Sequence, residues 1–491
     1  MAAEFTMRSP LERLPFEVLE MMCAFLPRAD LKALRLVSRA FDGPSLSTLF
    51  RTVYLKVHLG SFEKLLDISR SEKLNKHVRY ISYDCRVLDA SRVSPDFAHW
   101  VAETACKGLC NRYHVASFVQ QFTQEELDGF YQNYRQFQSD QQHMLKDDNE
   151  NRMLRDALQN LPRLLGVESR MPDPREMSTV RPPSERAWSQ NSLSTVAQKI
   201  LVEPPRLEGG ELEATRHFWA LLQSAFLAGH AERLTHIHGE YMELNSWRDA
   251  AAASSLANYD GGFPSLQHLS LSFIDYEHSD EATDYIGGII ADAPSLRSLL
   301  LYFDFGDYMP FCELIWPDVE LHHLRSLSLY GLCVTETQLR DGLGAFRGTL
   351  RSLELADMSF IPGSWVLFFR FLSKEMTLDH VKLYGGLGNY RDEEWIARDE
   401  RQSPLPALAG ASARDSRKYL VYRLERFITG RGRYPDPFTP RKKRDGDLEK
   451  YGYSLPWAFK QDRSWYHSDT VWSAREWENT YPLATRWTLP T

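Results

Sequence analysis

The feature that most constrains this chain is a short apolar pattern that occurs five times between residues 265 and 385. In each copy, two residues separate the first apolar position from the second and one residue separates the second from the third, as in SLRSLLLYF and HLRSLSLYG. The first positions fall at 266, 296, 324, 350 and 378, so successive copies lie 30, 28, 26 and 28 residues apart. Alternating apolar residues predict a short strand, and a fixed period of this length predicts stacked units of one strand and one return segment.

This pattern resembles the leucine-rich repeat, although the asparagine or cysteine that usually follows the strand is absent. One repeat leaves a face uncovered, and stacking of neighbours buries a continuous core. Fainter copies of the strand lie near residues 50–55, 78–83, 164–167 and 234–237. We therefore expect an α/β chain with an irregular leucine-rich-repeat-like solenoid over residues 51–390, interrupted by a helical insertion at 84–160 and a proline-rich disordered loop at 168–210.

Residues 391–491 form a separate C-terminal region, for which we predict a helix near 412–428 followed by an aromatic-rich tail. A fully disordered tail would contain few aromatic residues, so we expect part of this one to be ordered. Two placements remain open. The tail either caps the C-terminal end of the repeats or lies across their inner surface and regulates access to it.

Residues 11–50 form a second strongly constrained stretch. Pro15 marks a helix start, apolar residues then surround the helix, and Pro27 ends it. Apolar residues at helical spacing predict a second helix that Gly43 and Pro44 end, so the segment is expected to be a helical hairpin. A helix that is apolar on every side must bury every side, and about 40 residues cannot enclose a core alone. The hairpin therefore docks either on its own chain or on a second protein.

The residues LPFEVLEMMCAFLPRADLKALRLVSRAF, from Leu14 to Phe41, resemble an F-box. In that family a Leu-Pro-x-Glu-Val/Ile-Leu opening is followed by Leu-Pro, Asp-Leu and Leu-Val-Ser-Arg, and all four occur here in order. Phe41 stands where many members carry tryptophan, which many fungal members also lack. F-box proteins bind the small Skp-type adaptor of a cullin–RING ubiquitin ligase and present substrates to it.

The resemblance implies an F-box at residues 8–50 that binds the Skp-type adaptor and, through it, the cullin–RING ligase. The residues expected at the adaptor surface or its rim are Leu14, Pro15, Glu17, Val18, Leu19, Leu26, Asp30, Leu31, Leu34, Val37, Ser38 and Arg39. Some of these side chains must instead form the small core of the hairpin itself, and the pattern does not separate the two groups.

The inner surface of the predicted repeats is the expected place for target binding. Side chains alternate along a strand, so the leucines face the core and the residues between them line the opposite face. Tyrosine is enriched where proteins bind each other because it gives a large contact area at a small entropic cost. The predicted substrate-binding residues are His268, Tyr302, Tyr330, Lys382 and Tyr384. Tyr302, Tyr330 and Tyr384 occupy the same position in their repeats and are expected to form a tyrosine column across the strands. Alternatively, the aromatic tail covers this column.

Composition argues against several classes of protein. The net charge of −8 and the pI near 6.0 give no reason to expect general affinity for nucleic acid. Six scattered cysteines fit buried thiols in a reducing compartment, and the N-terminus lacks the apolar core of a secretory signal. The most apolar window, at 365–372, is too short to span a membrane. We expect a cytoplasmic and/or nuclear protein without a nucleic-acid or membrane partner.

Catalytic motifs are absent from the sequence. It has no phosphate-binding glycine loop, no zinc-protease motif and no nucleophile elbow. His236, His238 and Glu240 alternate on a predicted strand, and Cys106 and Cys110 share a predicted helix face, but neither set completes a metal site. We therefore expect no catalytic residue, no cofactor and no metal, and a hidden enzyme based on the His236 cluster is the least favoured alternative.

These observations favour a non-catalytic subunit of a ubiquitin ligase. The expected function is substrate recognition in an SCF-type (cullin–RING) E3 ligase, with the F-box bound to the Skp-type adaptor and the repeats bound to a protein target that the sequence does not identify. The alternative is an interaction scaffold that binds the adaptor without delivering targets for ubiquitylation.

Overall fold

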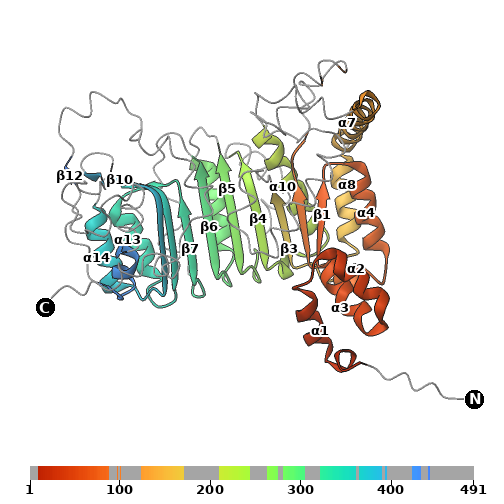
Figure 1. Ribbon diagram of the computed structural model, residues 1–491. Coiled ribbons are helices and arrows are strands. Elements are labelled where there is room, and N and C mark those ends of the chain that lie inside the picture. Colours follow the sequence, from red (N-terminus) through yellow and green to blue (C-terminus); the bar gives the residue numbers. More distant parts are fainter. Residues whose placement is uncertain are drawn as a thin grey trace, which may run out of the picture. The chain divides into compact units, whose positions relative to one another are not determined.

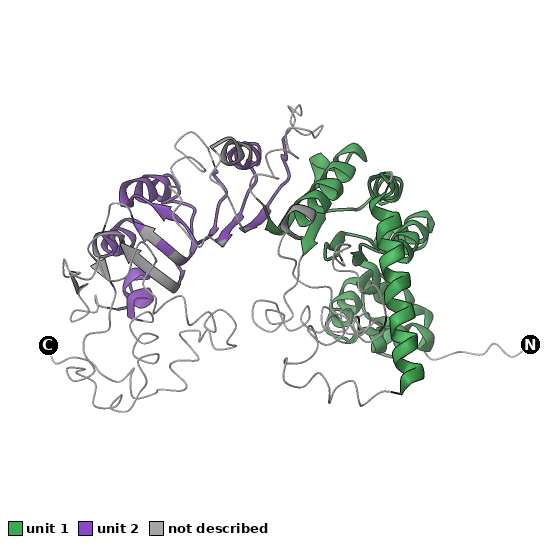
Figure 2. Ribbon diagram, turned by 90° about the horizontal axis from the view of Figure 1, so that it is seen from above, with its two compact units in different colours: residues 1–260 green, residues 261–491 purple. Residues whose placement is uncertain are grey.

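The computed structural model describes residues 9–87, 97, 100, 123–146, 148–170, 210–243, 262–274, 280–304, 321–360, 364–389, 393–394, 423–432 and 441–442. The chain divides into two compact units, unit 1 (Met1–Asp260) and unit 2 (Gly261–Thr491), which Figure 2 colours separately. In each unit a parallel sheet is flanked by helices (Figure 1).

Unit 1 begins with a 3-10 turn, η1 (Leu11–Arg13), and three helices, α1 (Phe16–Cys23), α2 (Arg28–Val37) and α3 (Arg39–Phe50). Pro15 and Pro27 stand directly before α1 and α2, where the missing N–H of proline costs no helical hydrogen bond. Ser38 has an extended backbone with φ −156°, and its side chain accepts a hydrogen bond from the Ala40 N–H. Ser38 therefore ends α2 and caps α3.

The sheet of unit 1 has four parallel strands in chain order, β1 (Thr52–Lys56), β2 (Tyr80–Asp84), β3 (Gly166–Arg170) and β4 (His236–Met242). Its apolar side chains, such as Leu55 and Ile81, are buried. The helices α4 (Leu59–Arg70) and α10 (Gly210–Leu227) pack on the sheet, α8 (Asn149–Leu158) packs between them, and α7 (Gln124–Leu145) packs on α4 and α8. Two 3-10 turns, η2 (Asn75–His77) and η6 (Ala231–Arg233), precede β2 and β4.

Unit 2 contains five parallel strands that pair in chain order, β5 (His268–Ile274), β6 (Ser298–Asp304), β7 (Ser326–Tyr330), β9 (Ser352–Phe360) and β10 (His380–Asn389). The two-residue strand β8 (Cys333–Val334) pairs with β9, and β11 (Glu393–Glu394) and β12 (Arg441–Lys442) extend the sheet in antiparallel fashion. The connecting helices are α12 (Asp280–Ala291), α13 (Glu336–Ala345) and α14 (Trp365–Glu375).

The core of unit 2 is built from the alternate strand residues and from α14. Leu271, Leu301 and Leu329 are fully or almost fully buried on neighbouring strands. Phe360 at the end of β9 stacks on Trp365 of α14, with ring centroids 4.1 Å apart. The leucines of the repeated pattern therefore supply the layer between sheet and helices, and the residues between them lie on the opposite face of the sheet.

The predicted fold class, a helical F-box hairpin followed by an irregular leucine-rich-repeat-like solenoid, is wrong. The structure is an α/β arrangement in which nine strands, four in unit 1 and five in unit 2, pair in parallel and are flanked by helices. The predicted hairpin is three helices, because Ser38 ends α2 and caps α3. Pro44 lies inside α3 and does not end a helix there. Several strands also extend well past the apolar pattern, as in the 10-residue β10. Only the general α/β character agrees.

The boundaries predicted around the insertions also need correction. The predicted disordered loop starts too early, because Glu168 to Arg170 form the end of β3, paired with β2. The predicted helical insertion contains α7 and α8, and Thr123 and Glu126 form a capping box at the start of α7. The aromatic tail beyond residue 442, residues 101–122 of the predicted helical insertion and residues 171–209 of the predicted loop lie outside the described residues.

Candidate functional site

The three N-terminal helices share a small core of their own. Cys23, Leu31 and Leu49, one from each helix, are almost fully buried and pack together, with Leu26 and Leu34 against them. Polar contacts add to this packing, because the Ser47 hydroxyl of α3 donates to the Glu20 carboxylate of α1. These contacts hold the helices in a fixed arrangement, so the side chains on their outer surface are preorganised.

An ion-pair network ties α2 to α3 and to the chain beyond α4. The Arg35 Nε lies 2.9 Å from one Asp42 carboxylate oxygen, and the Lys73 Nζ lies 2.8 Å from the other. Hydrogen bonds from Lys73 and Arg35 lower the pKa of the Asp42 carboxyl. The three residues are partly exposed, so their main effect is to fix geometry rather than to add much stability.

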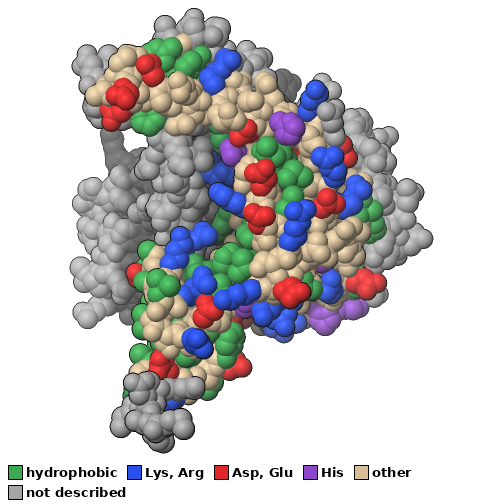
Figure 3. Space-filling model, turned by 90° about the vertical axis from the view of Figure 1, so that its right-hand side faces the viewer, with side chains coloured by type: hydrophobic (Ala, Val, Ile, Leu, Met, Phe, Trp, Pro, Cys, Tyr) green, Lys and Arg blue, Asp and Glu red, His purple; other side chains and the backbone are tan. Residues whose placement is uncertain are grey.

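The outer surface of these helices carries an apolar patch. We use this name for the exposed large apolar side chains of residues 11–37, which are Leu11, Phe16, Met21, Met22, Phe25, Leu36 and Val37. Phe25 is 87% exposed and Leu36 is 89% exposed. Figure 3 shows apolar side chains at the surface in the lower part of the view, where these helices lie. In the described residues of unit 2, by contrast, Leu367 is the only large apolar side chain exposed to this degree.

The predicted adaptor-binding residues divide into three groups. Leu19 and Leu31 are buried, so neither side chain is available at the surface, and Leu31 belongs to the core of the segment. A second group is half-buried: Leu14, Val18, Leu26, Leu34 and Ser38. The exposed group is Pro15, Glu17, Asp30, Val37 and Arg39. Six patch residues were not among those predicted from the sequence: Leu11, Phe16, Met21, Met22, Phe25 and Leu36. For Leu36 a signal was present, because it follows Lys32 by four positions and therefore shares the polar face of α2.

A second surface is the open face of the unit 2 sheet, where the strand register fixes three rows of side chains. His268, Ser298, Ser326, Ser352 and His380 form the first row. Ser270, Leu300, Ser328, Glu354 and Lys382 form the second row. Ser272, Tyr302, Tyr330, Ala356 and Tyr384 form the third row. Ser328 and Ala356 are buried among their neighbours, and the other described side chains of the three rows are partly or fully exposed. This open sheet face is rich in hydroxyl groups and contains both charges and aromatic rings.

The predicted substrate-binding residues occupy different rows of this face. Tyr302 and Tyr330 are brought together, with ring centroids 5.7 Å apart. Lys382 is exposed and lies 3.5 Å from the Glu354 carboxylate, which also accepts a hydrogen bond from Ser328. His268 is exposed in the first row, although neighbouring atoms shield part of its ring from water. This partial burial, together with the charge of Arg297, lowers the pKa of His268.

The predicted tyrosine column is interrupted. Ala356 lies between Tyr330 and Tyr384 in the register, so only the first two tyrosines are direct neighbours. Tyr384 belongs to β10 by its backbone, and its side chain lies outside the described residues.

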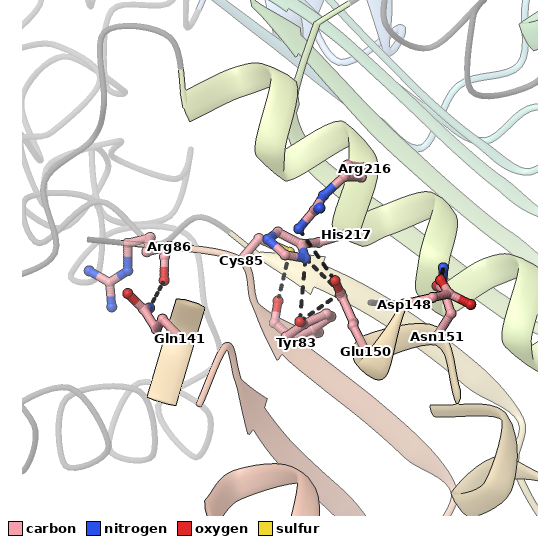
Figure 4. Close-up of polar contacts among 9 residues, drawn as sticks. All are labelled: Tyr83, Cys85, Arg86, Gln141, Asp148, Glu150, Asn151, Arg216 and His217. Atoms are coloured by element: carbon pink, nitrogen blue, oxygen red, sulfur yellow. Dashed lines mark hydrogen bonds and ion pairs between the residues drawn. The ribbon is translucent and has the colours of Figure 1, made fainter. Parts of the chain in front are cut away.

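A buried polar cluster in unit 1 joins three elements (Figure 4). The Glu150 carboxylate of α8 accepts a hydrogen bond from the Tyr83 hydroxyl of β2 at 2.8 Å and lies 2.6 Å from the His217 Nδ1 of α10. Arg216, half-exposed at the surface, lies 3.5 Å from the second carboxylate oxygen. All three central side chains are almost fully buried, so this cluster holds α8, α10 and β2 together and is closed to a substrate.

The metal site weighed from the sequence at His236, His238 and Glu240 is not completed among the described residues. The His238 Nε2 lies 2.9 Å from a Glu240 carboxylate oxygen, and the His236 Nδ1 lies 2.8 Å from the Thr235 hydroxyl. Across the described ranges no group of three or more His, Cys, Asp or Glu residues could hold a metal ion. Cys106 and Cys110 lie outside those ranges.

Three of the cysteines lie among the described residues. Cys23, Cys85 and Cys333 are buried and form no disulfide, and burial raises the pKa of the Cys85 thiol, which makes it unreactive. Among the helices that the structure describes, none has the length and apolar character needed to cross a bilayer.

Comparison of the chain with models of known protein families and with curated proteins finds no match in either set.

Proposed function

We propose that this protein is a substrate-recognition subunit of an SCF-type ubiquitin ligase. In this proposal the N-terminal helices bind a Skp-type adaptor through the apolar patch, and the open sheet face of unit 2 binds the protein target. The proposal joins the F-box-like residues between Leu14 and Phe41 with the exposure of apolar side chains on the same segment.

The apolar patch is the observation that carries the proposal. Burying a large apolar side chain is worth roughly 1.5–3 kcal/mol, and this segment leaves seven of them at least 43% exposed. Seven such side chains within residues 11–37 are more than the single scattered ones that soluble monomers normally expose, and such concentrations mark interaction sites. The segment already has its own core at Cys23, Leu31 and Leu49, so the exposed residues are not needed for its folding. A protein partner explains why they are retained.

The open sheet face of unit 2 supports the second half of the proposal. Its tyrosine pair and its hydroxyl rows offer aromatic contact area beside hydrogen-bonding groups, the combination typical of protein interfaces. The receptor itself needs no reactive group. Holding a target near a charged ubiquitin-conjugating enzyme raises its effective concentration and makes the encounter intramolecular.

Co-purification with a Skp-type adaptor tests the adaptor half of the proposal. Phe25→Ser combined with Leu36→Ser removes the two most exposed patch side chains and leaves the core of the segment intact. We expect this variant to lose the adaptor while its circular dichroism and melting temperature stay unchanged. Leu367→Ser, an equally drastic change at a 53% exposed leucine on α14, is the matched control and should retain the adaptor.

Reconstitution separates the proposal from a scaffold that binds the adaptor only. The complete ligase, assembled with cullin, RING subunit and conjugating enzyme, should transfer ubiquitin to a protein captured by unit 2. Adaptor binding without transfer to any captured protein would favour the scaffold. Adaptor binding by the Phe25→Ser/Leu36→Ser variant at wild-type strength would refute the role of the patch.

A further inference from the structure

Three neighbouring strands of unit 2 each begin directly after an arginine. Arg297, Arg325 and Arg351 precede β6, β7 and β9 and occur in the repeated letters Leu-Arg-Ser-Leu. The Arg325 N–H donates to the Arg297 carbonyl at 2.8 Å, and the Arg351 N–H donates to the Arg325 carbonyl at 2.8 Å. Because paired strands lie about 4.8 Å apart, the three arginines occupy successive positions along the edge where the parallel strands start. We call this row the arginine edge.

The three guanidinium groups are used differently. That of Arg351 is half-buried and donates to turn carbonyls, at 2.8 Å to Leu350 and at 2.9 Å to Gly348. Arg297 and Arg325 are exposed, and within the described part of the chain neither forms an ion pair or a side-chain hydrogen bond. Two arginines at neighbouring backbone positions of the arginine edge therefore keep their guanidinium donors available.

The surroundings of Arg297 and Arg325 suit an anion. A guanidinium presents its N–H groups as a planar fork that matches a carboxylate or a phosphate. Ser298 and Ser326 follow the two arginines directly, are only partly buried and carry hydroxyl donors. Arg297 lies near His268 on the neighbouring strand, where its charge adds to the effect of burial in lowering the pKa of that histidine. Bound anionic oxygens would relieve the repulsion between these cations.

We propose that the arginine edge binds an anionic segment of the target protein, with carboxylate or phosphate oxygens bridging Arg297 and Arg325. This inference rests on the proposed function and adds to it the chemical class of target. A short segment fits better than a long polyanion, because the protein as a whole carries a net charge of −8 and repels extended negative charge at a distance.

Fluorescence anisotropy with the full-length protein tests this inference. The probes are labelled peptides of about 12 residues, one rich in glutamate, one with phosphoserines at the same positions and one with unmodified serines. The edge variant combines Arg297→Ser with Arg325→Ser. The control variant combines Arg135→Ser on α7 with Arg155→Ser on α8, which removes the same charge from exposed positions of unit 1.

We expect the anionic peptides to bind the wild type and the control variant equally and the edge variant about tenfold more weakly, because two exposed guanidinium contacts are lost. Raising the salt concentration to about 1 M should weaken binding, since the screening length falls to roughly 3 Å. Tighter binding of the phosphoserine peptide would identify phosphate as the anion. Equal binding of both anionic peptides would show that the arginine edge accepts carboxylate and phosphate groups alike.

Three results would overturn the inference. They are equal affinity of the edge variant and the wild type, absence of binding by both anionic peptides, and equally tight binding of a single-stranded oligonucleotide of the same charge. The edge variant should still co-purify with the Skp-type adaptor, because the arginine edge belongs to unit 2 and the apolar patch belongs to unit 1. Failure of peptide binding with the adaptor retained therefore refutes this inference alone.

Discussion

The Glu150 carboxylate lies 2.6 Å from the His217 Nδ1, and both side chains are almost fully buried between α8 and α10. The two residues are 67 positions apart in the sequence, so their pairing fixes one helix of unit 1 against another. The Tyr83 hydroxyl donates to the same carboxylate oxygen from β2. A single buried charge therefore organises the contact between the sheet and two of its helices.

Removing that charge should destabilise unit 1. We expect Glu150→Gln to lower the free energy of unfolding by about 2 kcal/mol at pH 7, because hydrogen bonds to a charged group are stronger than those to a neutral one. Urea unfolding measures this loss. Glu232→Gln, which changes an exposed carboxylate in the same unit, should leave stability unchanged. Equal stabilities for the two variants would contradict the structural role of the pair.

The same pair predicts how unit 1 responds to acid. Burial raises the pKa of Glu150, but the charges and hydrogen bonds of His217, Arg216 and Tyr83 outweigh it, so the folded-state pKa lies below the ordinary 4.5. The stability that the carboxylate contributes is present above pH 4.5 and is lost as the pH falls through the lowered pKa. We expect the stability difference between wild type and Glu150→Gln to shrink below pH 4.5. A difference that stays constant down to pH 3 would count against this ionisation.

Glu425 predicts the opposite pH dependence in unit 2. Its carboxylate accepts a hydrogen bond from the Leu383 N–H of β10 at 3.0 Å, and burial raises its pKa from 4.5 to about 8. The stability contributed by the neutral form is fully present below pH 4.5 and is lost as the pH rises through 8, by at most about 1.4 kcal/mol per pH unit. Glu425→Gln keeps an acceptor for Leu383 and should remove this decline in a pH series of melting temperatures. A decline that persists in the variant would assign it to another group.

Gly331 marks a place where the backbone leaves no room for a side chain. Its φ is +72°, its N–H donates to the Ala356 carbonyl at 2.9 Å, and a Cβ would collide with the carbonyl oxygen of Phe303. We expect Gly331→Ala to cost about 3 kcal/mol or more, from backbone strain and steric overlap together. At Gly229, where φ is +79° and a Cβ would contact nothing within 4 Å, alanine should cost only about 1 kcal/mol. Thermal unfolding of the two variants separates the cost of the left-handed backbone, which both glycines share, from the cost of the steric overlap, which only Gly331 has.

The division of the N-terminal helices into core and patch can also be tested. Leu31 is fully buried, so Leu31→Ala should loosen the segment by about 3 kcal/mol and increase hydrogen exchange throughout α1, α2 and α3. Phe25→Ser removes a side chain that is 87% exposed and should leave exchange unchanged. Similar exchange profiles for the two variants would show that the division is wrong.

The local apolar pattern predicted the positions of strands better than the way they are assembled. The five copies of the pattern do lie on β5, β6, β7, β9 and β10, because alternation of apolar residues depends only on near neighbours in sequence. The predicted class failed because the pattern does not determine strand length or the packing of flanking helices. Pro44 gave a false helix end, since a proline near the start of a helix breaks few hydrogen bonds.

The candidate sites show a similar limit. Burial of Leu19 and Leu31 depends on how α1, α2 and α3 pack together, which the motif resemblance does not encode. The exposed Leu36 carried a detectable signal, because it shares a helix face with Lys32. The pair of Glu150 and His217 carried none, since nothing in either local sequence indicates the partner.

Isothermal titration of a purified Skp-type adaptor into the full-length protein tests the central claim most directly. We predict one binding site per chain with a dissociation constant of about 1 μM or tighter, and a binding enthalpy that becomes more negative with temperature because apolar surface is buried. The Phe25→Ser/Leu36→Ser variant should release no binding heat at any temperature, and Leu367→Ser should match the wild type. If the wild type shows no binding at several temperatures, or the double variant binds with the same affinity, the apolar patch is not an adaptor site and the account is contradicted.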